Sequence, residues 1–152
     1  MNKKTNIFIA AALVAFFILI QLVPYGRNHA NPPTVQEPKW DSLRTQEIFM
    51  RVCKNCHSNR TEWPWYSNVA PFSWLVQYDV DEGRSEFNAS EWGRAKNKGD
   101  ETAKMVREGE MPPWYYLPPH PEARLSKAER EDFARGLALT FGEKKEKQER
   151  GK

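Results

Sequence analysis

Five consecutive residues, Cys53-Lys54-Asn55-Cys56-His57, constrain this chain more than any other part of its sequence. They contain both cysteines of the chain and one of its three histidines. At this spacing the two thiols can form a disulfide or act as a redox pair. Together with the imidazole they can contribute to a metal site or attach a haem covalently. The rest of the sequence discriminates among these four chemistries.

Three of the four chemistries fit the remaining sequence poorly. A disulfide between Cys53 and Cys56 is possible outside the cytoplasm, but it closes a loop too small to restrict the unfolded chain much. A structural zinc ion needs four ligands; the chain has no second cysteine pair, and neither His29 nor His120 stands at zinc-finger spacing. A thiol redox pair is typical of a βαβ context, which this sequence lacks, and it is kept as the main alternative.

Covalent haem attachment requires the pattern Cys-x-x-Cys-His, which is present here. On a helix, residues three apart lie on nearly the same face, so both thiols can reach the vinyl groups along one edge of a haem. His57 follows directly and is delivered beneath the iron as an axial ligand. The sequence therefore predicts one haem c, attached through Cys53 and Cys56, with His57 bound to the iron.

The second axial ligand has five candidates: Met50, Met105, Met111, His29 and His120. Met50 precedes the motif in the same predicted helix, and His29 lies outside the folded region. Met105 has the spacing of a core side chain in a short amphipathic helix. Met111 precedes two prolines in a stiff loop, so its thioether is well placed to meet the haem iron. Met/His ligation also suits electron transfer. Met111 is the preferred ligand, with His120 or an open site as alternatives.

The N-terminus carries a targeting signal. Lys3 and Lys4 precede an apolar run from Ile7 to Val23 that only Gln21 interrupts. This length lies at the lower edge of a membrane span, and no clean cleavage site follows, so an uncleaved signal anchor is preferred over a cleaved signal peptide. The two lysines favour a cytoplasmic N-terminus, which places the chain after the apolar run in the periplasm. Haem c is attached outside the cytoplasm, so the location agrees with the motif.

Charge and composition indicate one small domain without affinity for nucleic acid. Without Lys3 and Lys4 the chain has 21 basic and 20 acidic side chains, so no basic surface for nucleic acid is expected. Aromatic residues make up 12% of the chain, which suits wrapping a large flat ligand as well as packing a core. The length of 152 residues leaves room for one domain.

Capping residues and apolar periodicity predict an all-α domain of about five short helices. No alternation typical of strands is present. Four segments follow: a signal anchor over residues 1–23, a flexible periplasmic tether over 24–40, the cytochrome c-like haem-binding domain over 41–142 and a charged tail over 143–152. The first expected helix begins at Asp41 or Ser42 and ends at Asn59-Arg60, and the second runs from Pro71 to Gly83. The third runs from Asp100 to Gly109, and the last from Ser126 to Gly142.

Three motifs together resemble the small bacterial haem-binding domain family, a cytochrome c-like group with an N-terminal membrane segment. They are Cys53-x-x-Cys56-His57, Trp63-Pro64-Trp65-Tyr66 and Met111-Pro112-Pro113-Trp114. The resemblance covers roughly residues 41 to 141. It implies a cytochrome c-like fold around one haem, with Cys53 and Cys56 as thioether attachments, His57 proximal and Met111 distal.

The resemblance also implies contacts around the haem. Phe49 would pack on the C-terminal helix, where Phe133, Gly136 and Leu137 would form the opposing surface. The glycine would permit the two helices to approach closely. Trp63, Trp65 and Trp114 are candidate haem-pocket residues, although each is equally compatible with a role in filling the core.

These features predict a membrane-anchored, monohaem c-type cytochrome that carries single electrons and is not an enzyme. Its partners would be the membrane, through the N-terminal helix, and a redox protein of unknown identity. The alternatives are a haem-based redox or gas sensor with a labile or open distal site, or a small haem peroxidase that uses His120 as its acid–base residue.

Overall fold

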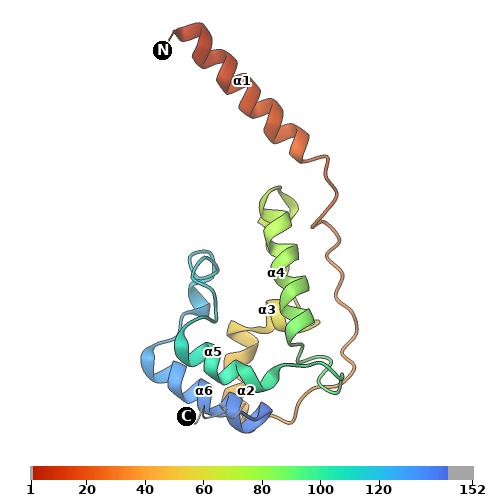
Figure 1. Ribbon diagram of the computed structural model, residues 1–152, viewed down its shortest axis with the longest axis vertical. Helices are drawn as coiled ribbons and strands as arrows, with labels where there is room; N and C mark the ends of the chain where they lie inside the picture. Colours follow the sequence, from red (N-terminus) through yellow and green to blue (C-terminus); the bar gives the residue numbers. More distant parts are fainter. Residues whose placement is uncertain (1, 144–152) are drawn as a thin grey trace, which may run out of the picture.

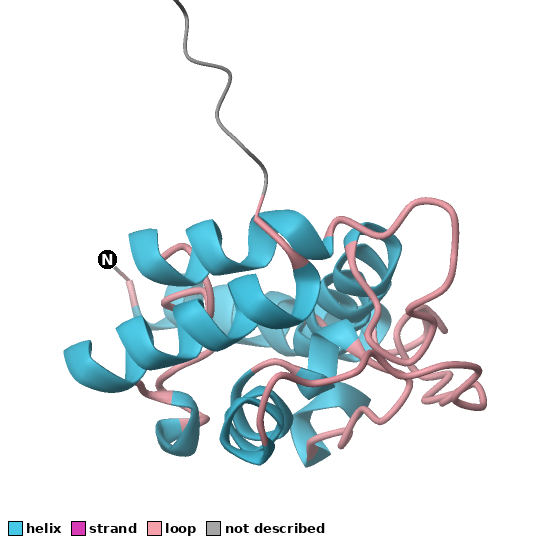
Figure 2. Cartoon of the chain, turned by 90° about the horizontal axis from the view of Figure 1, so that it is seen from below, coloured by secondary structure: helices cyan, strands magenta, loops and turns pink. Residues whose placement is uncertain are grey.

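The computed structural model describes residues 2–143, and every regular element in this range is a helix (Figure 1, Figure 2). An isolated bridge between Gln36 and Glu91 is the only β-type pairing in the same range. The predicted all-α fold with an N-terminal apolar helix is therefore confirmed. The α-helices are α1 Lys3–Ile20, α2 Leu43–Val52, α3 Lys54–His57, α4 Phe72–Glu86, α5 Thr102–Glu108 and α6 Lys127–Phe141, and 3-10 turns cover Trp65–Asn68, Gly99–Glu101 and Pro121–Ala123.

The first predicted domain helix is divided into two. Ser42 caps α2 by accepting a hydrogen bond from the Thr45 amide at 3.2 Å. The helix ends at Cys53, whose amide donates to the Phe49 carbonyl while its own carbonyl accepts from the amides of Cys56 and His57. Cys53 thus ends α2 and begins α3. The prediction of one helix to Asn59-Arg60 was wrong, because the chain turns at the first cysteine.

Two further helix boundaries differ from the sequence expectation. Helix α4 does not stop at Gly83 but continues to Glu86. Gly83 lies within the helix, where its lack of a side chain allows close contact with Cys56. Helix α5 begins at Thr102, after a 3-10 turn that contains Asp100. Its end at Gly109, which has a φ of 81°, and the capping box of Ser126 with Glu129 at the start of α6 are as predicted.

The core lies where α2, α5 and α6 meet (Figure 1). Phe49 is 1% exposed and packs in one cluster with Phe133 and Leu137, as the family resemblance implied. A Cβ atom added to Gly136 would lie 2.0 Å from Oγ1 of the buried Thr45. Glycine is therefore required where α6 crosses α2. The full buried cluster is Ile48, Phe49, Val52, Phe87, Ala89, Ala103, Val106, Phe133, Ala134, Leu137 and Phe141.

Helix α1 projects away from the domain (Figure 1). It has 18 residues, is apolar enough to cross a membrane, and buries none of them within the protein. A helix that is apolar on all sides and has no protein around it is suited to a lipid environment.

The segment predicted as a flexible tether, residues 24–40, is extended and lies against the domain. The imidazole of His29 stacks on Trp63 with ring centroids 4.6 Å apart. The Trp92 amide donates to the Gln36 carbonyl at 3.0 Å. The segment is thus attached to the domain by hydrogen bonds and ring stacking and is not a free tether. Most of the predicted charged tail, from residue 144 onward, lies outside the described residues.

The close approach at Gly136 generates a stability prediction. In Gly136→Ala the new methyl group would collide with Thr45, and overpacking a filled core costs about 1–3 kcal/mol. This outweighs the gain of about 1 kcal/mol that alanine offers over glycine inside a helix. We expect the melting temperature to fall by several degrees in thermal unfolding followed by circular dichroism.

Leu139→Ala is the matched control, because Leu139 lies in the same helix and is 76% exposed. Its melting temperature should stay close to that of the parent protein. Adding Thr45→Ala to Gly136→Ala should restore part of the loss. A Gly136→Ala protein as stable as its parent would contradict the contact described.

Candidate functional site

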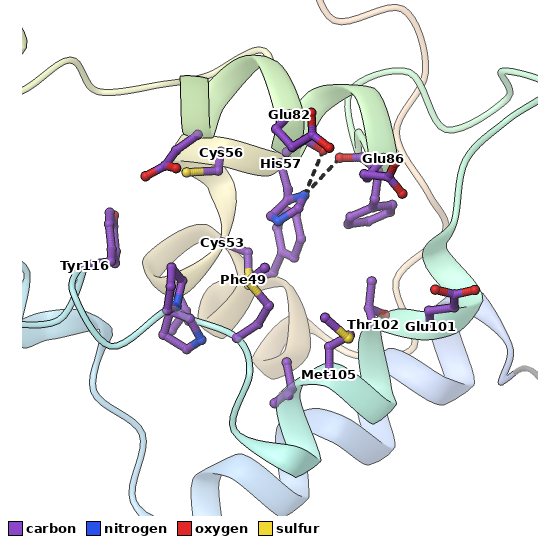
Figure 3. Close-up of a pocket in the computed structure, with 18 of the residues that line it drawn as sticks. Phe49, Cys53, Cys56, His57, Glu82, Glu86, Glu101, Thr102, Met105 and Tyr116 are labelled. Atoms are coloured by element: carbon purple, nitrogen blue, oxygen red, sulfur yellow. Dashed lines mark hydrogen bonds between the residues drawn. The ribbon is translucent and has the colours of Figure 1, made fainter. Parts of the chain in front are cut away.

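A cavity of about 320 Å³ opens between α3, α4, α5 and the loop that follows α5 (Figure 3). Its wall is mainly apolar and aromatic, and it reaches the core at Phe49 and Leu137. The apolar and aromatic lining residues are Phe49, Val52, Tyr78, Phe87, Val106, Pro112, Pro113, Tyr115, Tyr116 and Leu137. A largely apolar cavity with a few polar groups is typical of a site for a flat organic ligand.

The structure brings Cys53, Cys56 and His57 together in this cavity. Both cysteines are free thiols and are half-buried. Burial raises the pKa of the Cys53 thiol. Burial, helped by the Asp79 carboxylate and opposed by Arg84, raises the pKa of the Cys56 thiol to about 12. Both groups are therefore neutral thiols at physiological pH, unlike the reactive thiolate of a redox pair.

The imidazole of His57 is held by backbone carbonyls at the end of α4. Its Nδ1 lies 3.1 Å from the Gly83 oxygen and 3.0 Å from the Phe87 oxygen, and since a carbonyl only accepts, Nδ1 carries the proton. Burial lowers the pKa of His57, while these two hydrogen bonds act in the opposite direction. The ring is thus neutral, with its other nitrogen, Nε2, available as a metal ligand.

Gly83 allows α3 and α4 to approach closely enough for these hydrogen bonds. A Cβ atom added to it would lie 2.6 Å from the Cys56 carbonyl oxygen. Sequence reasoning missed this role, because a glycine near the end of an apolar pattern also predicts a helix end. The residues that follow it, Arg84-Ser85-Glu86, do not distinguish the two roles.

Two methionines line the cavity, Met105 in α5 and Met111 in the loop after Gly109. Figure 3 shows His57 and Met105 entering the cavity from opposite sides. The Met111 amide donates to the Met105 carbonyl at 3.2 Å, so the loop turns back onto the end of α5. The geometry therefore offers two thioethers, where sequence reasoning preferred Met111 and placed Met105 in the core.

Four carboxylates also line the cavity. Asp79, Glu82, Glu86 and Glu101 line it, together with Lys98, whose ammonium group is paired with Glu86. The Tyr115 hydroxyl donates to Asp79 Oδ1 at 3.3 Å and so joins the loop after α5 to α4. Burial raises the pKa of Asp79. The cavity wall is thus mainly apolar and includes several acidic side chains.

The three candidate tryptophans are not among the residues that line this cavity. Trp65 and Trp114 are both 80% exposed. Trp63 is half-buried against His29. All three lie in segments next to the site, but the structure does not bring their side chains together with the thiols and the imidazole.

The remaining ligand candidates are also elsewhere. His120 is engaged through both ring nitrogens: Nε2 lies 2.8 Å from the Tyr66 hydroxyl and Nδ1 lies 3.0 Å from Glu122 Oε1. Met50 packs against the core cluster. His29 is stacked on Trp63. None of the three lines the cavity.

The donor set fits a haem better than a bare metal ion. Residues 2–143 contain no cluster of three or more His, Cys, Asp or Glu side chains arranged to hold a metal ion. Instead one neutral imidazole faces an apolar cavity that also contains two adjacent thiols and two thioethers. A macrocycle that supplies its own four nitrogen ligands needs only such axial donors from the protein.

Comparison with known proteins agrees with this chemistry. Residues 15–138 match the family model described as a haem-binding domain. Searches of curated proteins and of solved structures gave no match. The matched range contains every residue that lines the cavity and begins within α1. The family expected from the sequence motifs is confirmed: the chain belongs to the haem-binding domain family.

Proposed function

We propose that this haem-binding protein is a membrane-anchored, monohaem c-type cytochrome that transfers single electrons. Cys53 and Cys56 form the thioether attachments, His57 is the proximal ligand and Met111 is the distal ligand. Haem bound here supplies an iron centre that cycles between its ferrous and ferric states. The polypeptide holds it, selects its axial ligands and excludes water from it.

The observation that carries the proposal is the orientation of His57 beside two cavity-lining thiols. Its Nδ1–H is committed to the carbonyls of Gly83 and Phe87, so Nε2 is the nitrogen left for a metal. An outer-shell hydrogen bond of this kind fixes the tautomer and ring orientation of a metal-bound histidine. A merely structural histidine would have no need of two neighbouring thiols in the same apolar cavity.

The thiols are suited to permanent attachment and not to redox exchange. Attachment would add each thiol across one vinyl double bond: the S–H bond and the C=C π bond would be replaced by one C–S and one C–H bond, so no oxidant is required. A disulfide exchange site works through a thiolate with a lowered pKa, whereas burial raises the pKa of Cys53 and Cys56. This supports haem attachment over the thiol redox alternative.

The domain would stand on the periplasmic side of a bacterial inner membrane, anchored by α1. The lysines at the start of α1 favour a cytoplasmic N-terminus. Gln21 lies within the apolar segment and its side chain is hydrogen-bonded to Ala70, so removal of that segment would also remove contacts of the folded part. This supports an uncleaved anchor.

The contacts of His120 argue against the peroxidase alternative. A peroxidase needs an acid–base residue over an open distal face. The ring nitrogens of His120 are instead paired with Tyr66 and Glu122, outside the cavity lining. A sensor with a labile distal ligand is separated from an electron carrier by the ligand substitutions described below.

Loss of either thiol should change how the haem is retained. In the double variant Cys53→Ala/Cys56→Ala we expect haem to be extracted by acidified organic solvent, whereas it should remain with the parent polypeptide. Each single variant should retain one thioether and show a pyridine haemochrome band shifted from that of the parent. Haem that stays fully bound to the double variant after extraction and denaturation would refute covalent attachment at these residues.

The two methionines form a matched pair for testing the distal ligand. Met111→Ala should remove the weak long-wavelength absorption of ferric His/Met ligation and allow the reduced protein to bind carbon monoxide. Its reduction potential should also fall, because a thioether ligand raises it. Met105→Ala should leave the spectrum unchanged. The reverse pattern would assign the ligand to Met105, and persistence of the band in both variants would exclude both thioethers.

A further inference from the structure

The end of α1 is joined directly to the loop in front of α4. The Gln21 side chain donates to the Ala70 carbonyl at 3.0 Å and accepts from the Ala70 amide at 2.9 Å, as a backbone partner would. A few residues later, a Cβ atom added to Gly26 would lie 2.2 Å from the Ser73 carbonyl oxygen. These contacts hold this end of the domain against the point where the apolar helix ends (Figure 1).

Aromatic and apolar side chains are exposed beside this junction. Trp65 is 80% exposed, Phe72 57% and Leu75 45%. Tyr66 contacts two of them, with ring centroids 5.9 Å from Trp65 and 6.4 Å from Phe72. We call these four residues the aromatic patch. An exposed patch of this kind marks an interaction surface, and its position next to α1 indicates the partner.

The surrounding sequence contains no charge. The sixteen residues from Trp63 to Tyr78 include no Asp, Glu, Lys, Arg or His, although 28% of the chain is charged. The first charge in α4 is Asp79, and the seven helical residues before it rise about 10 Å. That distance is comparable to the depth of about 5–10 Å that interfacial segments occupy in the headgroup region.

We propose that the aromatic patch lies in the headgroup region of the bilayer that α1 spans. The inference rests on the membrane anchor of the proposed function. Tryptophan and tyrosine concentrate at this depth, because their rings are apolar while their N–H and O–H groups require polar partners. A protein partner at the patch would have to displace the lipid that surrounds the end of α1.

The patch would also set the orientation of the haem cavity. Phe72, Leu75 and Tyr78 are spaced three residues apart along α4, and all three are exposed. Tyr78 also lines the cavity. The domain would thus rest on the membrane with its cavity at a defined height and angle.

The test uses the full-length holoprotein in lipid vesicles. The attached haem occupies Cys53 and Cys56, so an added cysteine can be labelled alone with an environment-sensitive nitrobenzoxadiazole dye. Phe72→Cys places the dye in the patch, Leu75→Cys repeats the measurement one helical turn later, and Leu139→Cys is the matched exposed control on α6. Quenching is measured with iodide in water and with nitroxide-labelled phospholipids.

We expect the dye at residues 72 and 75 to be quenched several-fold more strongly by labelled lipid than the dye at residue 139, with the opposite order for iodide. Equal iodide quenching at all three positions, with no quenching by lipid, would overturn the inference. Two measurements on the same sample distinguish failure of the patch inference from failure of the proposed membrane anchor. Alkaline extraction that released the protein would refute both the anchor and the patch, whereas a membrane-bound holoprotein with iodide-accessible dyes would refute only the patch.

Discussion

The close contact between Gly83 and Cys56 is the constraint on which the rest of the site depends. Because no side chain separates the two helices there, α3 lies directly on α4. The carbonyls of Gly83 and Phe87 thereby come within hydrogen-bonding distance of His57 and orient its ring. The same approach places both thiols at the wall of an apolar cavity. One glycine thus positions the imidazole and the two cysteines together.

Features determined by local chemistry were predictable from the sequence. The cap at Ser42, the capping box at Ser126 and the stop at Gly109 each depend on a few neighbouring residues, and each is present. The haem-binding family followed from motifs that are contiguous in the chain. The joint presence of Cys53, Cys56 and His57 in one cavity also followed, because five consecutive residues cannot separate widely.

Features determined by tertiary contacts were not predictable in the same way. A glycine that ends a helix and one that lets two helices touch look alike in sequence, which is why the end of α4 was misplaced at Gly83. Met105 has the spacing of a core residue and nevertheless lines the cavity, since the cavity reaches the core. Trp65 and Trp114 flank the ligand-bearing segments in sequence but are exposed on the domain surface instead of lining the cavity, a matter of side-chain direction that spacing alone does not determine.

Under the proposed function, the docked segment after α1 has a consequence for how electrons would be delivered. A free chain of the length of residues 24–40 would let a domain range over about 20–25 Å and swing between a donor and an acceptor. Here the pairing of Gln21 with Ala70 and the stacking of His29 on Trp63 remove that range. Donor and acceptor would therefore have to approach in turn by lateral diffusion. Their own dimensions above the bilayer would decide which of them can engage this protein.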